Sequence, residues 1–164
     1  MWPTILALAA AAVAAYTAVL KTKHEKLWVE TYEKSVSALV KANIITRYLQ
    51  SEENGEFYIH GLTAHEKNTL NEQWPIARYE LARDLAYLGV LYPERDFERV
   101  NDAWLLLQGE LFAMMEQSSP HDVHEYVRSA LSKSRSFESA LIKALRQNCV
   151  EPNLLRWVRK IRRR

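Results

Sequence analysis

The sequence predicts an all-α protein in which an N-terminal transmembrane helix continues into an up-and-down bundle of about four helices. Three observations indicate this fold class: an uncharged run over residues 2–20, apolar residues at helical spacing through the rest of the chain, and only 4 glycines and 5 prolines among 164 residues. The chain divides into a transmembrane anchor (1–22), a cytoplasmic helical bundle (23–152) and a short basic amphipathic helix at the C-terminus (153–164).

The anchor is predicted from length and charge. As a helix, residues 2–20 would be about 28 Å long, close to the thickness of the hydrocarbon core of a bilayer. Lysines follow directly after this run, which indicates a single-pass protein with its N-terminus outside and its bundle in the cytoplasm. Tryptophans at both ends suit the two membrane interfaces. The residues that we expect to flank the anchor are Trp2, Lys21, Lys23, Lys26 and Trp28.

Two other interpretations of the same segment stay open. A cleaved signal peptide would suit its alanine-rich sequence, but residues 1–4 carry no Lys or Arg, and the positive charge lies on the far side. A buried helix of a water-soluble domain is the other alternative, although an uncharged run of this length is unusual there. Eight alanines lie within residues 2–20, and alanine favours insertion less than leucine does.

The first helix of the bundle is predicted over residues 23–51. Its apolar row has a spacing of four, and no Gly or Pro separates it from the anchor, so one long helix should leave the membrane and enter the bundle. Asn54-Gly55 then provides a turn signal. The row consists of Trp28, Tyr32, Val36, Val40, Ile44 and Tyr48.

The second helix is predicted to begin after Thr63, which forms a capping box with Glu66. It should end at Leu88, because Gly89 stands where a C-terminal cap belongs. Pro75 lies inside this run, and it either kinks the helix or marks its true start.

Pro93 suits the first turn of the third helix. The residues after it alternate spacings of three and four, which indicates a heptad seam. Its core residues should be Phe97, Val100, Trp104, Leu107, Leu111 and Met114. The helix is apolar beyond this seam, so core packing is the ordinary interpretation and contact with a partner helix or second copy is the functional one. The candidate partner surface consists of Trp104, Leu105, Phe112 and Met115.

Ser119-Pro120 marks the start of the fourth helix, which should run to about Gln147 and stop before Pro152. The serine-rich stretch 132–136 is weakly helical and is expected to weaken or break the run. Short connections between the helices then return residues 153–164 to the membrane side.

The C-terminal segment concentrates positive charge. Its six cations are Arg156, Arg159, Lys160, Arg162, Arg163 and Arg164, and they leave 16 basic against 20 acidic residues for residues 1–155, a net charge of −4. Together with Trp157, they predict contact with anionic lipid. A solvated tail and binding to the phosphates of nucleic acid are the alternatives, and nucleic acid suits an acidic, membrane-tethered body less well.

Chemical motifs are few. One cysteine, Cys149, excludes an intramolecular disulfide, and the chain has no phosphate-binding loop or nucleophile elbow. His121 and His124 are weak metal candidates, since the Glu-x-x-His pairs of a di-iron bundle are missing. We expect no cofactor and no enzymatic activity.

The sequence therefore predicts a binding protein: an adaptor, sensor or regulatory subunit at the cytoplasmic face of a membrane. Its expected partners are membrane lipid and a protein partner or second copy of the chain. The first alternative is a membrane-associated effector or enzyme subunit that acts on lipid or nucleic acid through the basic tail. The second is a metal-binding helical bundle.

Overall fold

The computed structural model describes residues 2–54, 63–116 and 120–150, with side chains for residues 14–53, 63–116 and 124–149. The helices are α1 (Trp2–Asn54), α2 (Ala64–Leu91), α3 (Glu94–Glu116) and α4 (Pro120–Leu145), followed by a π-helical turn, η1 (Arg146–Val150). Because the described residues form these four helices and no strand, the all-α prediction is confirmed.

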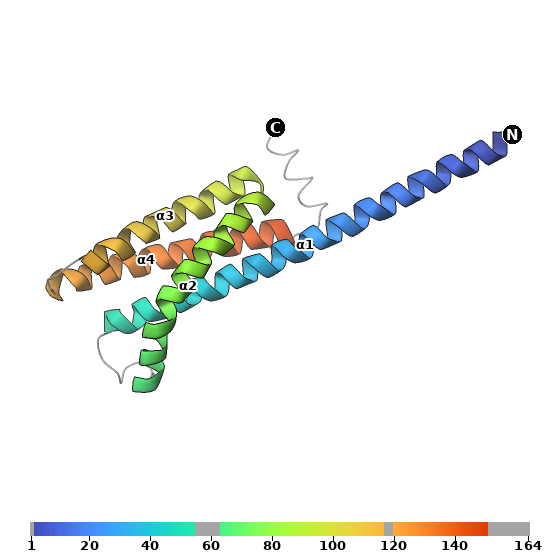
Figure 1. Ribbon diagram of the computed structural model, residues 1–164. Coiled ribbons are helices and arrows are strands. Elements are labelled where there is room, and N and C mark those ends of the chain that lie inside the picture. The colour runs from blue at the N-terminus through green and yellow to red at the C-terminus, as the bar shows by residue number, and fades with distance from the viewer. Residues whose placement is uncertain (1, 55–62, 117–119, 151–164) are drawn as a thin grey trace.

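The four helices alternate in direction along one bundle (Figure 1). α1 lies beside both α2 and α4, and α3 packs mainly on α4. α2 and α3 are consecutive but have little contact with each other. The bundle is therefore two helix pairs joined through α1 and α4, with α2 crossing at a steep angle in Figure 1.

α1 is one continuous helix that projects far beyond the bundle (Figure 1). Every side chain described from Ala14 to Glu30 is exposed, and Thr31 is the first buried residue of the helix. No glycine or proline interrupts α1 after Pro3, so its backbone hydrogen bonds run unbroken from the extension into the bundle. The predicted continuity between residues 1–22 and the first bundle helix is therefore observed.

The described part of the chain contains no helix that is long and apolar enough to cross a membrane. The predicted transmembrane helix over residues 1–22 is not supported by this finding. Within that segment, described side chains run only from Ala14 to Thr22, and a charged sequence begins at Lys21. Trp2 and the other residues before Ala14 lie outside the described side chains.

The core forms where the apolar rows of all four helices meet. Its fully buried large side chains include Ile45, Leu49, Leu81, Leu88, Val100, Leu107, Leu111, Phe137 and Leu141. Five of the six residues of the predicted seam in α3 are buried, and Phe97 packs against the cluster while partly exposed. The prediction from helical periodicity was therefore accurate for the core face of α3.

Helix starts followed the predicted signals. Thr63 and Glu66 form the expected capping box, with the Thr63 amide donating to Glu66 Oε2 at 2.7 Å. The Pro93 carbonyl accepts hydrogen bonds from the amides of Asp96 and Phe97 at the start of α3. α4 begins at Pro120 as predicted.

The predicted end of α2 at Gly89 was wrong, because α2 continues to Leu91 and Tyr92 is its C-cap. Gly89 instead lets α2 and α3 pack closely. A β-carbon at this position would lie only 3.0 Å from Phe97 Cζ of α3. Pro75 likewise lies inside α2, so the alternative that the helix starts at this residue was wrong.

The predicted break at the serine-rich stretch of α4 was also wrong, since α4 continues through residues 132–136. Ser134 is fully buried against α1, where its hydroxyl lies 2.6 Å from Thr46 Oγ1. Thr46 in turn donates to Glu138 Oε1 at 2.8 Å. A polar contact between helices therefore stabilises the segment that intrinsic helix propensity disfavours.

A buried carboxylate joins α1 to α2. Asp84 is 1% exposed, and its Oδ2 accepts hydrogen bonds from Lys41 Nζ at 2.5 Å and Ser37 Oγ at 2.7 Å. Lys34 Nζ lies 3.9 Å from the other oxygen. Burial by itself raises the pKa of Asp84, but the hydrogen bonds from Lys41 and Ser37 and the charges of Lys41 and Lys34 outweigh burial and hold this pKa below its ordinary value.

Replacing Asp84 by Asn should lower the free energy of unfolding by about 3 kcal/mol, because the largely buried Lys41 ammonium loses its closest charge partner. Urea denaturation at pH 7 measures this difference. Glu80→Gln is the matched control: Glu80 also pairs with Lys41, but its side chain is 39% exposed, so its loss should change the free energy by less than about 1 kcal/mol.

The difference in the free energy of unfolding between the wild type and Asp84→Asn should depend on pH. Since the pKa of Asp84 is lower in the folded state, its stabilising contribution is fully present above the unfolded pKa of about 4. It is lost as the pH falls through the folded-state pKa. An Asp84→Asn variant that is as stable as the wild type at pH 7 would contradict the role given to this carboxylate.

Candidate partner-binding surface

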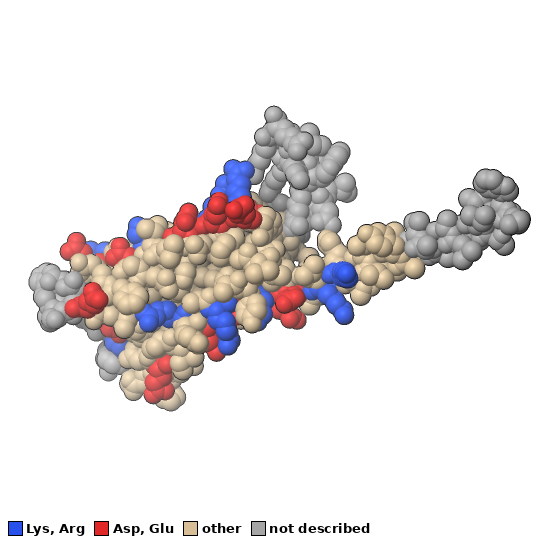
Figure 2. Space-filling view, turned by 45° about the horizontal axis from the view of Figure 1, so that its top comes forward, with Lys and Arg blue, Asp and Glu red and all other residues tan. Residues whose placement is uncertain are grey.

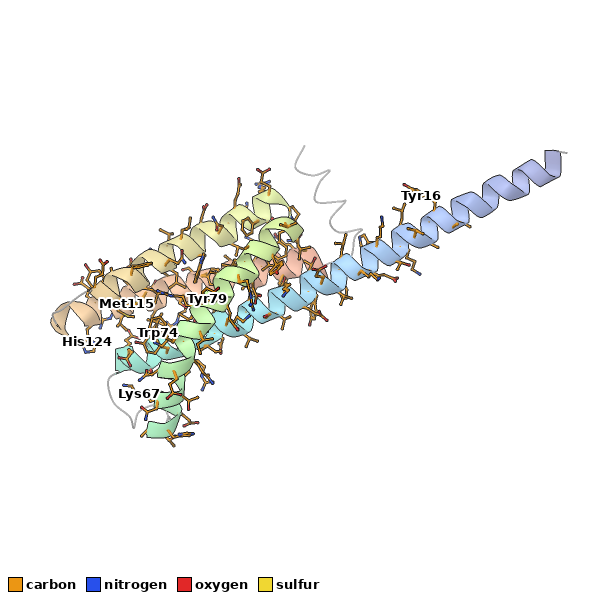
Figure 3. The ribbon with its side chains drawn as sticks, viewed as in Figure 1. Tyr16, Lys67, Trp74, Tyr79, Met115 and His124 are labelled. Carbon is orange, nitrogen blue, oxygen red and sulfur yellow. The ribbon has the colours of Figure 1, made fainter. Side chains whose placement is uncertain are left out.

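Large apolar side chains remain exposed where α2 and α3 separate. We call this region the α2–α3 surface and define it by Trp74, Arg78 and Tyr79 of α2 with Leu105, Phe112 and Met115 of α3. Figure 3 shows Trp74, Tyr79 and Met115 at the same end of the bundle.

The separation of the two helices follows from their packing partners. Near their connection α2 and α3 lie close, because Gly89 leaves room for the Phe97 ring. Farther from the connection α2 follows α1 and α3 follows α4, so the first half of α2 diverges from the second half of α3 (Figure 1). Phe112 and Met115 on this flank of α3 therefore stay about half exposed.

Arg78 spans the two helices across this separation. Its guanidinium carbon lies 5.6 Å from the centre of the Phe112 ring and 5.9 Å from the centre of the Trp74 ring. Its Nη1 donates to Met115 Sδ at 3.6 Å. These contacts show that the flank of α3 carrying Phe112 and Met115 faces α2, and the cation–π geometry makes Arg78 part of an otherwise apolar surface.

Trp74 and Tyr48 form the buried base of this surface, which we call the aromatic floor. Trp74 is only 9% exposed, and its ring stacks on Tyr48 of α1 with the ring centres 4.6 Å apart and an angle of 9° between the planes. Burial, with a smaller contribution from Glu52, raises the pKa of Tyr48 to about 12, so the stacked phenol stays neutral at physiological pH. The floor is therefore an aromatic pair fixed between two helices.

The outer part of the α2–α3 surface consists of apolar side chains that are more than half exposed. Leu105, Phe112 and Met115 are each 55% exposed, and Tyr79 is 74% exposed. Spacings of seven and three place the three α3 residues along one side of that helix. Single exposed apolar residues are ordinary on protein surfaces, but several of them near one another on two helices are typical of an interaction site.

Three of the four residues predicted for the partner surface are exposed, and Trp104 is the correction. Trp104 is 4% exposed and packs against Phe137 of α4, with ring centres 5.5 Å apart. It belongs to the core seam rather than to any accessible face. Sequence analysis missed Trp74, Arg78 and Tyr79 as members of the surface, although the i, i+4 spacing of the first two was visible.

The other predicted sites lie elsewhere. Lys21, Lys23 and Lys26 are exposed on the α1 extension, and Trp28, 44% exposed, lies at its base. The predicted lipid-binding or phosphate-binding residues all lie outside the described residues: Arg156, Arg159, Lys160, Arg162, Arg163 and Arg164.

The two histidines do not form a site that the structure describes. His124 is exposed near the start of α4 (Figure 3), and the His121 side chain lies outside the described side chains. Among the described residues, no three His, Cys, Asp or Glu side chains are grouped so that they could bind a metal.

Comparison with known proteins found no match for this chain among protein families, curated proteins or solved structures.

Replacing Arg78 by Ala should lower the free energy of unfolding by about 1 kcal/mol, because the contacts with Trp74, Phe112 and Met115 are lost together. Urea denaturation followed by tryptophan fluorescence measures the change. Arg128→Ala is the control, since Arg128 is 81% exposed and pairs with Glu53 at 3.6 Å, and its loss should have almost no effect. Equal stabilities of the two variants would show that Arg78 does not join α2 to α3.

Proposed function

We propose that this protein is a membrane-anchored binding protein, an adaptor, sensor or regulatory subunit, which binds a helix of a partner protein through the α2–α3 surface. The observation that carries the proposal is the group of exposed apolar side chains on two diverging helices, above a buried aromatic floor. The bundle lies on the cytoplasmic side, and the partner is a different protein or a second copy of this chain.

The geometry favours a helix as the bound element. Residues 105, 112 and 115 present a row at helical spacing, and an amphipathic helix laid along it could contact each of them. Burying the exposed half of one such side chain contributes about 1 kcal/mol, so Leu105, Phe112, Met115 and Tyr79 together contribute several kcal/mol. The opposite side of α3 is already packed in the core, so the backbone of α3 loses little conformational entropy when a partner binds.

Membrane attachment is supported by the extension of α1. Residues 2–20 carry no charge, and the described side chains of the extension pack on no part of the bundle core. Its exposed apolar residues include Tyr16, Val19 and Leu20, followed directly by lysines. An apolar helix that leaves a bundle in this way is stabilised when lipid covers it.

Partner binding should depend on the α2–α3 surface. Leu105→Asp/Phe112→Asp should reduce binding at least about tenfold, because two half-exposed apolar anchors become charged. A photoreactive amino acid at Tyr79 in the full-length chain, followed by mass spectrometry of the crosslinked products in membranes, measures the yield. Val40→Asp/Val90→Asp is the matched control, since these residues are 57% and 86% exposed but lie outside the surface. Equal yields from the two double variants would contradict the proposal.

Membrane attachment should depend on residues 2–20. Leu6→Arg/Leu8→Arg should move the protein from the carbonate-washed membrane pellet to the supernatant, because each arginine opposes insertion by about 3 kcal/mol near the helix centre. Val40→Arg/Val90→Arg, which adds the same charge to the bundle, should stay in the pellet. If the unaltered chain is found in the supernatant, the membrane part of the proposal is wrong.

A further inference from the structure

The outer side of α3 carries a second, largely exposed stripe of residues. Arg99, Asp102, Leu106, Gly109 and Ala113 follow one another at alternating spacings of three and four, so they lie along one side of the helix. Asp102 and Gly109 are exposed, and Leu106 is 59% exposed. None of these five residues belongs to the α2–α3 surface, so α3 has a further face on which another chain can pack.

Gly109 lies in the middle of this stripe and leaves it open. A β-carbon at position 109 would meet no atom within 4 Å. Glycine destabilises the interior of a helix relative to alanine, and no close neighbour in the described part of the chain requires it here. Its lack of a side chain lets another helix approach α3 closely at this point.

The outer side of α4 combines small hydroxyl side chains with cations. Two surface depressions, of about 570 and 260 Å³, follow this side and share Ser136 and Ser139. Arg99 of the α3 stripe lines the smaller depression together with Lys143 of α4, so the two outer sides adjoin on one face of the bundle. The exposed α4 residues along the depressions are Arg128, Ser132, Arg135, Ser136, Ser139 and Lys143.

The two helices carry opposite net charges. α3 contains six acids and two arginines, a net charge of −4. Residues 124–149 contain five cations and two acids, a net charge of +3. Among the ion pairs of the described residues, none involves a residue of α3, Arg135 or Lys143. These opposite charges therefore do not compensate one another through ion pairs within one copy.

The antiparallel packing of α3 on α4 determines which of their residues lie at the same height along the bundle. Trp104 meets Phe137 with ring centres 5.5 Å apart, and Asn148 donates to Asp96 at 3.2 Å. The two contacts indicate the same register to within three residues, or about 4.5 Å along the helix axes. Counting from them, Gly109 lies at the height of residues 132–135, and residues 98–102 lie at the height of residues 139–146.

We propose that two copies of this chain form a symmetric dimer in which α3 of each copy packs on the outer side of α4 of the other. A twofold axis parallel to the helices places each α3 over the α4 of the other copy without changing its height. Gly109 of one copy then comes level with Ser132 of the other. Small residues on both helices thus meet at the centre of the interface, where they permit close packing.

Opposite charges come together near one end of this interface. Glu98 and Asp102 of one copy come level with the exposed Lys143 and Arg146 of the other, and Arg99 is the single cation in that stretch of α3. The symmetry forms this contact twice in the dimer. Charge complementarity therefore favours a second copy of the chain as the occupant of both outer sides.

The same axis directs both extensions of α1 to one side of the dimer. α1 leaves the bundle at one end (Figure 1, Figure 2), and rotation about an axis parallel to the helices does not reverse that direction. Two copies would therefore present their uncharged runs to the same membrane. The interface consists of α3 and α4, so Trp74, Arg78 and Tyr79 of α2 lie outside it.

The test measures dimerisation of the full-length chain in a mild nonionic detergent by sedimentation equilibrium. Glu98→Lys/Asp102→Lys should raise the dissociation constant of the dimer at least about tenfold, because like charges then face each other in both contacts. Lys143→Glu/Arg146→Glu should have the same effect. Glu30→Lys/Glu72→Lys is the matched control: it reverses two exposed acids outside α3 and α4 and should leave the dissociation constant unchanged.

Mixing the two charge variants tests the symmetry of the dimer. Each variant alone has repulsion in both contacts, whereas a mixed dimer has one contact with both charges reversed and one contact of wild-type charge. An equimolar mixture should therefore form a dimer of nearly wild-type affinity. A wild-type chain that sediments as a monomer, or variants that stay monomeric when mixed, would overturn the inference.

Gly109→Leu separates the interface from the stability of the helix. The leucine side chain should weaken the dimer at least about tenfold, because it fills the space that the other α4 needs. The urea midpoint of the dilute monomer should rise, since position 109 is surrounded by open space and leucine favours a helix more than glycine does. An unchanged dissociation constant would show that no helix packs closely at Gly109 and would contradict the inference.

Two further outcomes would replace this dimer by another interaction. If Leu105→Asp/Phe112→Asp dissociates the dimer and the charge variants do not, the copies meet through the α2–α3 surface; the inference is then wrong while the proposed function stands. If the wild type stays monomeric and binds an added DNA oligonucleotide, and Lys143→Glu/Arg146→Glu abolishes that binding, the outer side of α4 binds phosphates and the inference is wrong.

Discussion

The structure depends on the ion pair that Asp84 makes with Lys41 inside the contact between α1 and α2. A buried carboxylate is tolerated only where its charge is compensated, and Lys41, Ser37 and Lys34 provide that compensation from a single face of α1. Sliding α2 by one turn would move the Asp84 carboxylate away from the hydroxyl and ammonium groups that compensate its charge. The pair therefore fixes where α2 lies along α1, and with it the position of Trp74 above Tyr48.

The second helix contact is fixed by a smaller polar group. Ser134 and Thr46 meet in the interior, and Glu138 accepts a hydrogen bond from the same threonine, so α4 is aligned on the opposite side of α1. Because α1 aligns α2 and α4 separately, α3 follows α4 away from α2. The exposed flank that we assign to partner binding thus results from two polar contacts that lie inside the bundle.

Periodicity and capping signals were sufficient for the helices and for the core face of α3. For α1 the predicted row was wrong, because its buried apolar residues are Ala38, Ala42, Ile45 and Leu49. The residues of the predicted row are all at least partly exposed: Trp28, Tyr32, Val36, Val40, Ile44 and Tyr48. Val100, Leu107 and Leu111 could be assigned to the interior because their spacing admits one helical face. Such a pattern does not show which of two apolar faces meets a neighbour, so Trp104 was assigned both to the core seam and, with Phe112, to the candidate partner surface. The difference depends on Phe137, which is far away in the sequence. Capping signals also failed where a contact between distant residues determines the structure. A glycine at position 89 suggests the end of a helix, but α2 continues through it, and its lack of a side chain leaves room for the Phe97 ring of α3.

Because α1 is one continuous helix, it fixes the distance between the uncharged N-terminal run and the aromatic pair of Tyr48 and Trp74. Twenty-eight residues separate Leu20 from Tyr48, beneath Trp74, so a straight helix places that aromatic floor about 40 Å from the end of the uncharged run. With no hinge in between, the helix acts as a spacer of constant length. In the membrane-anchored arrangement that we propose, a partner helix therefore has to reach about 40 Å beyond the end of the uncharged run to contact the α2–α3 surface.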